Sequence, residues 1–237
     1  MLSIIIPARN EEDNLESILD YFTKGMSNID YEIIFINDFS EDNTFKKAEI
    51  IFKNQNNFKI FNNEKKGLGG AINLGITKCN GNNIAIMMAD LSDDIEDLKK
   101  YNSLMNEKNL DAILGSRFLK NSKVQDYPLK KMILNRIFNF FVAIIFLNRY
   151  NDYTNAFKIY KKNVLKTLMP FVSESFNIFL EIPLKIISRG YNYEIISINW
   201  IGRKKGKAKF KIKELQSKYL FTLFYCFLEK ILLKIKK

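Results

Sequence analysis

Short apolar runs alternate with amphipathic stretches along the first half of the chain, and this alternation constrains the fold most strongly. Residues 2–6, 31–36, 58–61, 84–88 and 112–114 have the length and character of buried strands, and helical patterns separate them. This spacing predicts an α/β fold with a mostly parallel sheet flanked by crossover helices. A polar loop follows each strand, so we expect these loops to meet at one edge of the sheet, where such folds bind ligands.

The composition changes after residue 129, where the apolar stretches become longer. The predicted elements are a helix over 132–147, a strand over 156–160, a helix over 175–189, a strand over 193–200 and a last helix from 212 to the end. We expect Pro183 to kink or restart the second of these helices. The basic segment 202–211 lies between the last strand and the last helix.

The charge balance indicates an anionic partner. The chain has 37 Lys and Arg against 26 Asp and Glu, a net charge of +11, which suits a phosphorylated substrate, an acidic membrane or nucleic acid. Nucleic acid fits worst, because the basic residues crowd one loop and one tail without interleaved aromatic side chains. The absence of histidine removes the usual general base and the usual zinc ligand. Cys79 and Cys226 are far apart and indicate reduced thiols in the cytoplasm.

The sequence predicts no membrane-spanning segment. The N-terminus lacks the basic start and the cleavage site of a signal peptide. Nowhere is there an uncharged stretch of roughly 20 residues, the length that a spanning helix needs. The apolar stretches 137–147 and 219–228 are too short to cross a bilayer but are able to lie on one. We therefore expect a cytoplasmic protein that associates peripherally with an anionic membrane surface.

A carboxylate-rich turn follows the strand predicted over 84–88. It contains Asp90, Ser92, Asp93 and Asp94. Hard oxygen ligands at a strand's carboxyl end suit Mg²⁺ or Mn²⁺ carrying a substrate's phosphates. Alternatively, Ser92 and Asp93 merely cap the helix that follows. The turn alone leaves both interpretations open.

The polar loops, taken together, resemble those of a known family. In chain order they are Ile4-Ile-Ile-Pro-Ala-Arg-Asn-Glu11, Asn37-Asp-Phe-Ser40, Lys65-Lys-Gly-Leu-Gly69, Met88-Ala-Asp-Leu-Ser92 and Gly115-Ser-Arg-Phe118. They resemble the family 2 glycosyltransferases of GT-A fold, and among these the polyprenyl-phosphate glycosyltransferases such as dolichol-phosphate mannose synthase. The likeness continues through 152–160, 179–182 and 203–209.

The resemblance implies a GT-A catalytic domain over 1–211, with a mixed and mostly parallel sheet, followed by a basic amphipathic helix over 212–237. It implies transfer of a hexose from a GDP- or UDP-linked sugar to a polyprenyl phosphate at the membrane surface, for cell-envelope glycan synthesis. It also implies the residues that bind the nucleotide sugar: Pro7, Asn10, Glu11, Asp38, Lys66, Gly67, Gly69, Ala89 and Asp90. For Asn10 and Asp38 the alternative is capping of a helix or turn. For the glycines it is an ordinary turn.

The resemblance implies that Asp90, with Ser92, holds Mg²⁺ or Mn²⁺. The family's motif has two aspartates, and Met88 stands in place of the first. A thioether cannot replace a hard carboxylate ligand, so this departure weakens the expected metal site. Ser92, Asp93 and Asp94 offer oxygen ligands close by that would partly compensate, although we expect helix capping as the main role of Asp93 and Asp94.

The resemblance implies catalytic roles for Asp90, Arg117 and Arg203. It places the acceptor lipid's phosphate, or the diphosphate, near a set of charged residues: Arg117, Arg136, Arg203, Lys205, Lys209 and Glu181. For the cations the alternative is a solvated or lipid-facing charge, and for the lysines it is attraction to the membrane. Glu181 alternatively ties the helices of the acceptor side together.

The missing histidine favours a phosphate acceptor. A sugar hydroxyl normally needs a general base, whereas a polyprenyl phosphate is already ionised at neutral pH. Two alternatives remain open. One is a family 2 transferase acting on a glycan or lipopolysaccharide hydroxyl, with a carboxylate as its base. The other is a catalytically weakened protein that binds sugar nucleotides, which Met88 suggests.

Overall fold

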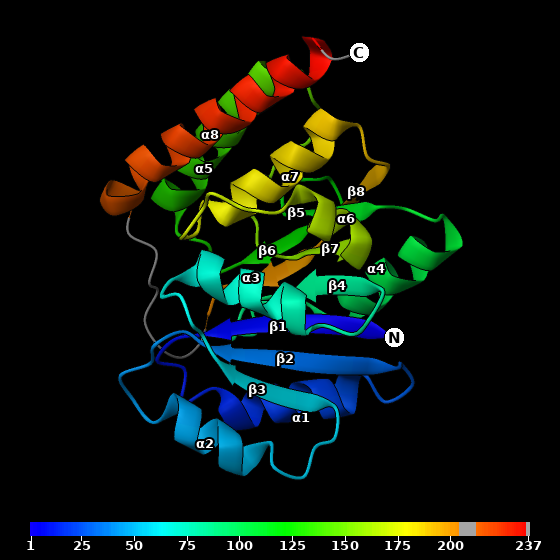
Figure 1. Cartoon of the computed structure of the whole chain (residues 1–237), viewed down its shortest axis with the longest axis vertical. Coiled ribbons are helices and arrows are strands. Elements are labelled where there is room, and N and C mark those ends of the chain that lie inside the picture. Colours follow the sequence, from blue (N-terminus) through cyan, green and yellow to red (C-terminus); the bar gives the residue numbers. More distant parts are fainter. Residues whose placement is uncertain (204–211, 236–237) are drawn as a thin grey trace.

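The computed structural model describes residues 1–203 and 212–235, which form an α/β fold around one large sheet (Figure 1). The elements of the first half are β1 (Leu2–Ala8), α1 (Leu15–Gly25), β2 (Tyr31–Asn37), α2 (Thr44–Ile51), β3 (Phe58–Asn62), α3 (Leu68–Lys78), β4 (Asn83–Ile86), α4 (Ile95–Glu107) and β5 (Ala112–Ser116). Those of the second half are β6 (Lys123–Gln125), α5 (Leu129–Phe146), β7 (Lys158–Lys161), α6 (Lys162–Leu168), α7 (Ile178–Arg189), β8 (Tyr193–Ser197), β9 (Asn199–Ile201) and α8 (Ile212–Ile235).

The main sheet has seven strands in the order β3-β2-β1-β4-β7-β5-β8. Among the strands that the structure describes, only β7 runs antiparallel to its neighbours, β4 and β5, and the other six share one direction. Their carboxyl ends therefore meet at one edge of the sheet, which lies to the left in Figure 1. This arrangement confirms the expected mixed, mostly parallel sheet.

The sheet is buried on both faces. In β1, Ile4 and Ile6 belong to one hydrophobic cluster and Ile5 to the other, as the two-residue period of a strand requires. The first cluster contains side chains of α1, α2 and α4, and the second contains side chains of α3, α5, α6, α7 and α8. Continuous apolar runs such as residues 2–6 follow from this double burial.

The strand predicted over 193–200 is wrong as a single element. Residues up to Ser197 form β8 beside β5, whereas β9 pairs with the three-residue strand β6 in a separate two-stranded sheet. The strand predicted over 84–88 ends earlier, at Ile86. The helix α6 and the strand β6 lack a sequence pattern that predicts them.

Two helices also differ from expectation. The predicted restart of the helix at Pro183 is wrong, because α7 runs without interruption from Ile178 to Arg189 with Pro183 inside it, and the alternative of a kink stays a prediction. Residues 178–186 are all buried, so packing outweighs the one backbone hydrogen bond that proline removes. The helix α3 begins at Leu68 rather than at Ala71, which places Gly69 and Gly70 in its first turn.

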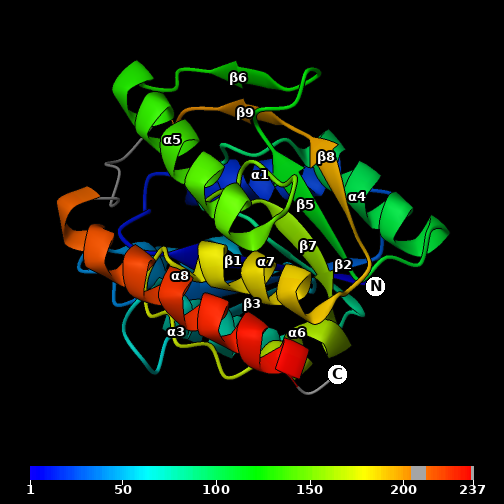
Figure 2. The ribbon, with the colours of Figure 1, turned by 90° about the horizontal axis from the view of Figure 1, so that it is seen from above.

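The helices α5 and α8 lie at the end of the molecule opposite α2 (Figure 1) and face the viewer in Figure 2. Both helices expose apolar side chains. On α5 these include Ile133, Ile137 and Phe140, and on α8 they include Phe221, Phe224 and Leu228, with 43% to 63% of each residue exposed. The opposite side of α8 contacts α7. Within the described residues, every helix is too short or too polar to span a membrane.

Candidate active site

An arginine joins two carboxylates at the carboxyl edge of the sheet. Arg203 follows β9, Glu11 follows β1 and Asp90 follows β4. The Arg203 Nη2 atom lies 3.2 Å from Glu11 Oε1 and 3.1 Å from Asp90 Oδ2. Burial raises the pKa of Glu11, and the neighbouring Arg203 and Asn14 oppose that shift. The three groups therefore form one partly buried, charged cluster where the sequence predicted the site.

Backbone hydrogen bonds hold Arg203 in this place. Ile201 N donates to Ser92 O at 3.0 Å, and Trp200 forms a β-bridge with Asp93. Gly202 N donates to Gln125 O, also at 3.0 Å, which ties the same strand to β6. The segment that carries Arg203 is thus fastened directly to the turn that carries Asp90.

The turn over 90–94 divides its roles between neighbouring residues. Asp94 caps α4 by accepting from Glu96 N at 2.9 Å, as predicted. The predicted capping role of Asp93 is wrong. Its carboxylate is buried, and its Oδ2 atom has no hydrogen-bond partner among the described residues. Burial, and secondly the nearby Asp90, raise the pKa of Asp93 to about 7.

The oxygen donors at Asp90 fit a metal that arrives with a phosphorylated ligand. Within the described part of the chain, no group of three or more His, Cys, Asp or Glu side chains is placed to hold an ion. However, Ser92 Oγ is buried without a hydrogen-bond partner among those residues, and its backbone N–H donates to Asp90 Oδ1. Mg²⁺ commonly takes one or two carboxylates, and substrate phosphates and water complete its shell. Asp90 and Ser92 fit that role, whereas Met88 packs against the apolar core.

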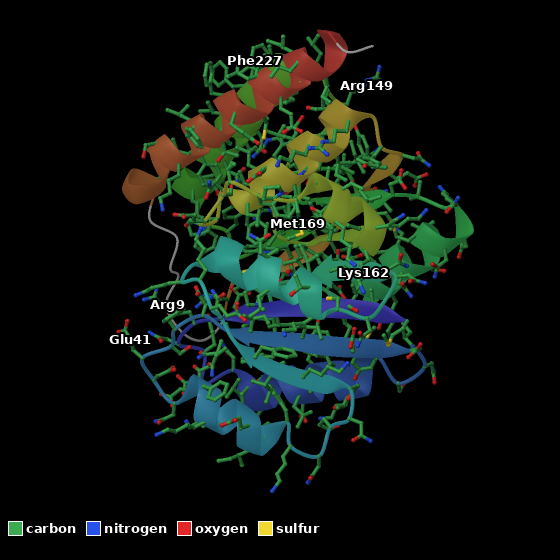
Figure 3. All side chains as sticks on the ribbon, in the orientation of Figure 1. Arg9, Glu41, Arg149, Lys162, Met169 and Phe227 are labelled. Carbon is green, nitrogen blue, oxygen red and sulfur yellow. The ribbon has the colours of Figure 1, made fainter. Side chains whose placement is uncertain are left out.

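Asp38 and Asn10 organise the loops beside this cluster. Asp38 Oδ1 accepts from Asn63 Nδ2 and from Gly67 N, both at 2.7 Å. Asn10 has a left-handed backbone, with φ 54°, and its Oδ1 accepts from Glu41 N at 2.8 Å. Figure 3 shows Arg9 and Glu41, which form an exposed ion pair at this edge. The turn-capping alternative therefore describes the contacts that Asn10 makes in this structure.

The glycines of the 65–70 loop are required by the protein's own backbone. Gly67 has φ 117°, and a Cβ at Gly67 or Gly69 would collide with the carbonyl oxygens of Glu174 and Ser173 respectively. Gly69 N donates to Glu174 O at 3.1 Å. The remaining residues expected at the nucleotide are placed differently: Pro7 and Ala89 are buried at the strand ends, and Lys66 is exposed.

Arg117 forms an ion pair with the carboxylate of Asp152. Its Nε and Nη2 atoms donate to Asp152 at 2.9 and 2.7 Å, and its backbone N–H also donates to Asp152. The Arg117 side chain is 8% exposed, and its guanidinium lies 5.1 to 5.5 Å from the ring centres of Phe118, Tyr127 and Trp200. Burial lowers the pKa of Arg117, but Asp152 outweighs it and the net shift is upward. Arg117 thus acts in the structure as an anchor for surrounding aromatic residues.

The other predicted charged residues are dispersed. Arg136 is exposed and stacks on Phe118 at 4.7 Å. Glu181 is fully buried, accepts from Val172 N and Ser173 N, and pairs with Lys185 of its own helix, so it ties the connection before α7 to α7. Lys205 and Lys209 lie outside the described residues.

Lys131 is a candidate site residue that sequence reasoning missed. It lies in the first turn of α5 and is half-buried. Burial, and then the positive charges of Arg117 and Arg203, lower its pKa, whereas Asp90 raises it. These interactions place the Lys131 charge within electrostatic range of the cluster. The only sequence signal is a cation at the start of an otherwise apolar helix.

Comparison with known proteins gives consistent matches. Residues 3–169 match the model of "Glycosyl transferase family 2". Dolichol-phosphate mannosyltransferase of Pyrococcus furiosus is 26% identical over 216 residues, which cover 90% of this chain and 60% of that protein. Dolichyl-phosphate beta-glucosyltransferase of Drosophila melanogaster is 30% identical over 183 residues, covering 70% of this chain and 56% of that protein. The chain therefore spans little more than half the length of these relatives.

Solved structures support the fold. Glucosyl-3-phosphoglycerate synthase of Mycobacterium tuberculosis, solved with Mn²⁺, UDP and phosphoglyceric acid, superposes with a TM-score of 0.74 at 14% identity. The superposition covers 96% of this chain and 78% of that one. The expected GT-A fold and the expected resemblance to polyprenyl-phosphate glycosyltransferases are thus confirmed. Because the family model covers well over half of the chain, this protein belongs to glycosyl transferase family 2.

Proposed function

We propose that the protein transfers a hexose from a GDP- or UDP-linked sugar to a polyprenyl phosphate at the cytoplasmic face of a membrane. The observation that carries this proposal is the cluster of Asp90, Arg203 and Glu11 at the carboxyl edge of the sheet. Similarity to dolichol-phosphate mannosyl- and glucosyltransferases supports the acceptor class. Asp38 suits either base, since a carboxylate accepts from the N–H groups of both uracil and guanine.

The cluster suits a diphosphate leaving group. Asp90 and Ser92 would hold Mg²⁺ or Mn²⁺, which would neutralise charge on the diphosphate oxygens. Arg203 supplies a cationic side chain of the protein beside the same position, and Lys131 interacts electrostatically with Asp90. Fixed positive charges where negative charge develops lower a barrier without reorganising during the reaction. The protein's own contribution is therefore positioning and charge stabilisation.

A phosphate acceptor fits a chain without histidine. The phosphate oxygen is ionised at neutral pH and attacks the anomeric carbon without a general base. A hydroxyl acceptor on a glycan would need a carboxylate as base. Asp90 and Glu11 are paired with Arg203, and Asp93, whose Oδ2 atom has no hydrogen-bond partner among the described residues, is only 3% exposed. This pairing favours the phosphate acceptor over the hydroxyl acceptor.

The exposed apolar faces of α5 and α8 support a membrane surface as the place of reaction. Lys130, Arg136 and Lys218 are exposed on the same two helices. An apolar face bordered by cations suits the interface of an anionic membrane, where a polyprenyl phosphate presents its headgroup. We propose peripheral association through these helices.

Met88 favours a second candidate function, that of a sugar-nucleotide-binding protein with weak catalysis. Met88 packs against the apolar core instead of offering a ligand, and Arg203 occupies Asp90. Nucleotide-sugar binding without turnover on any acceptor would support this candidate.

The test of the main proposal compares two lipids that differ only in the phosphate. The protein is incubated with radiolabelled UDP- or GDP-hexoses and either a polyprenyl phosphate or the corresponding free polyprenol. We expect label in the organic phase with the phosphate alone. Transfer to the free polyprenol, or to a glycan hydroxyl but to neither lipid, would overturn the proposal.

A further inference from the structure

The segment 172–177, which connects α6 to α7 and is called here the 172–177 turn, contacts three parts of the protein at once. One side meets the glycine loop (residues 65–70), the inner side meets Glu181 of α7, and the third side meets α8. These contacts join the expected nucleotide site to a helix whose other face is exposed and apolar.

The glycine loop rests on this turn. Gly69 N donates to Glu174 O, and Lys65 Nζ lies 3.0 Å from Glu174 Oε1. The missing Cβ atoms of Gly67 and Gly69 leave room for the turn's carbonyl groups rather than for a ligand. Gly67 N in turn donates to Asp38 at 2.7 Å. A shift of the turn would therefore move the glycine loop and change its bond to Asp38.

Buried groups on α7 hold the turn from within. Glu181 Oε1 accepts from Val172 N at 3.0 Å, and its Oε2 accepts from Ser173 N at 2.8 Å. Lys185 neutralises the carboxylate at 2.9 Å, and both side chains are at most 2% exposed. A carboxylate that accepts two backbone N–H groups fixes the backbone that donates them.

Two hydroxyl groups of α8 hold the turn from its third side. Tyr219 Oη donates to Phe176 O at 3.1 Å. Thr222 Oγ1 accepts from Asn177 Nδ2 at 2.9 Å and lies 3.2 Å from Ser173 Oγ. Thr222 is fully buried, whereas its neighbours Phe221 and Phe224 are about 60% exposed. The same helix thus contacts the turn with one face and presents the apolar surface with the other.

We infer that Thr222 and Glu181 are positioning residues for the nucleotide-sugar site. They fix the 172–177 turn, the turn fixes the glycine loop, and the loop sets the bond between Gly67 and Asp38. This inference rests on the proposed function, in which Asp38 and the glycine loop bind the nucleotide sugar. In this inference Glu181 helps to position the site of the donor, the nucleotide sugar, instead of binding the phosphate of the acceptor.

The test compares Thr222→Val with Cys226→Ala. Both positions are buried on the same face of α8, one turn apart, but only Thr222 bonds the turn. We expect Thr222→Val to raise the KM for the nucleotide sugar about three- to tenfold, the range of one lost hydrogen bond, with little change in kcat. Cys226→Ala should leave the KM unchanged, and Thr222→Ser, which keeps the hydroxyl, should restore it.

Gly69→Ala provides a second variant, because its methyl group would push directly on Ser173 O. We expect its KM to rise at least as much as that of Thr222→Val. If both variants lower only the melting temperature, or lower kcat at an unchanged KM, the inference is wrong. If the wild-type protein itself neither binds nor turns over a nucleotide sugar, the proposed function fails instead, so the two failures are distinguishable.

Discussion

Arg203 lies against Asp90, with its Nε and Nη2 atoms 3.3 and 3.1 Å from Asp90 Oδ2. The two residues are 113 positions apart in the sequence, and β9 brings them together by pairing with the turn at Ser92 and Asp93. The Arg203 guanidinium is thus hydrogen-bonded to the same carboxylate, Asp90, that the resemblance to the family assigns as a metal ligand. If Asp90 holds a divalent cation as proposed, that cation and Arg203 would compete for the same oxygen in the nucleotide-free protein.

Arg203→Met should bind Mn²⁺ more tightly than the wild-type protein when no nucleotide is present, by about tenfold, because Asp90 loses its competing cation. Turnover should fall by about a hundredfold or more, because the diphosphate loses a fixed positive charge. Titration of free Mn²⁺ by electron paramagnetic resonance measures the first effect. Arg203→Lys keeps the positive charge but lacks the planar guanidinium. Its Mn²⁺ affinity and its turnover should therefore lie between those of the wild type and those of Arg203→Met. Weaker Mn²⁺ binding by Arg203→Met would contradict the competition.

Met88→Asp should strengthen Mn²⁺ binding in the presence of a nucleoside diphosphate, by about tenfold, because it adds a second hard carboxylate beside Asp90. Met88→Asn has nearly the same shape without the charge and serves as the control. Both variants should lose a little stability, since Met88 packs against the apolar core. Isothermal titration calorimetry measures the Mn²⁺ affinity of each variant. Equal Mn²⁺ affinities of Met88→Asp and Met88→Asn would show that position 88 does not face the metal.

Asp152→Asn should destabilise the fold by about 3–5 kcal/mol, because it leaves the buried guanidinium of Arg117 without its counter-charge. Urea unfolding measures this loss. The prediction follows from Arg117 acting as an anchor for Phe118, Tyr127 and Trp200. If Arg117 instead contacts substrate, Arg117→Lys would reduce turnover with no change in the free energy of unfolding.

The buried Lys158 should make the stability of the fold depend on pH. Burial lowers its pKa to about 7, against the opposing charge of Asp152, and its Nζ atom donates to the carbonyl groups of Tyr153 and Asn155. Below that pH the lysine is charged in both states and its burial cost is felt in full. As the pH rises towards the ordinary value of 10.5, only the unfolded chain keeps the proton, so the folded state gains relative stability.

Lys158→Met should therefore remove a rise of a few kcal/mol in the free energy of unfolding between about pH 6.5 and about pH 9.5. Urea unfolding at the two pH values measures this rise. Lys161→Met, on the same strand, provides the control. An equal rise with pH in the wild type and in Lys158→Met would show that another group causes it.

Phe140→Glu and Phe224→Glu should each reduce binding to anionic vesicles, because they place a charge on the exposed apolar faces of α5 and α8. Co-sedimentation with phosphatidylglycerol vesicles measures the bound fraction. Ile50→Glu, at another exposed apolar residue on α2, is the matched control and should bind like the wild type. Equal loss in all three variants would indicate a general charge effect rather than these faces.

The strands of the first half were predictable because burial on both faces makes them continuous apolar runs. The division of 193–200 into β8 and β9 was not, because no glycine or proline marks it. The partner of β9 is a three-residue strand (Lys123–Gln125) with mostly exposed side chains, and it has no apolar pattern. The restart expected at Pro183 does not occur, because the burial of residues 178–186 outweighs the local preference of proline.

The sequence predicted which loops form the site, but not which side chains of those loops contact one another. Strand topology alone brings Glu11 and Asp90 to one edge, but no sequence rule pairs Arg203 with both of them. In the same way, no sequence rule predicts the ion pair between Arg117, in the segment 115–118, and Asp152, in the segment 152–160. The glycines of residues 65–70 were recognisable, but the backbone they accommodate, at Ser173 and Glu174, comes from tertiary structure.

The most direct measurement is the release of nucleoside diphosphate from UDP- and GDP-sugars, with and without a polyprenyl phosphate and with and without Mg²⁺ or Mn²⁺. We expect release that requires both the lipid and the metal and that Asp90→Ala abolishes, while the variant keeps the wild-type melting temperature. Release from no donor despite measurable nucleotide binding, or release that Asp90→Ala leaves unchanged, would contradict a glycosyltransferase centred on Asp90.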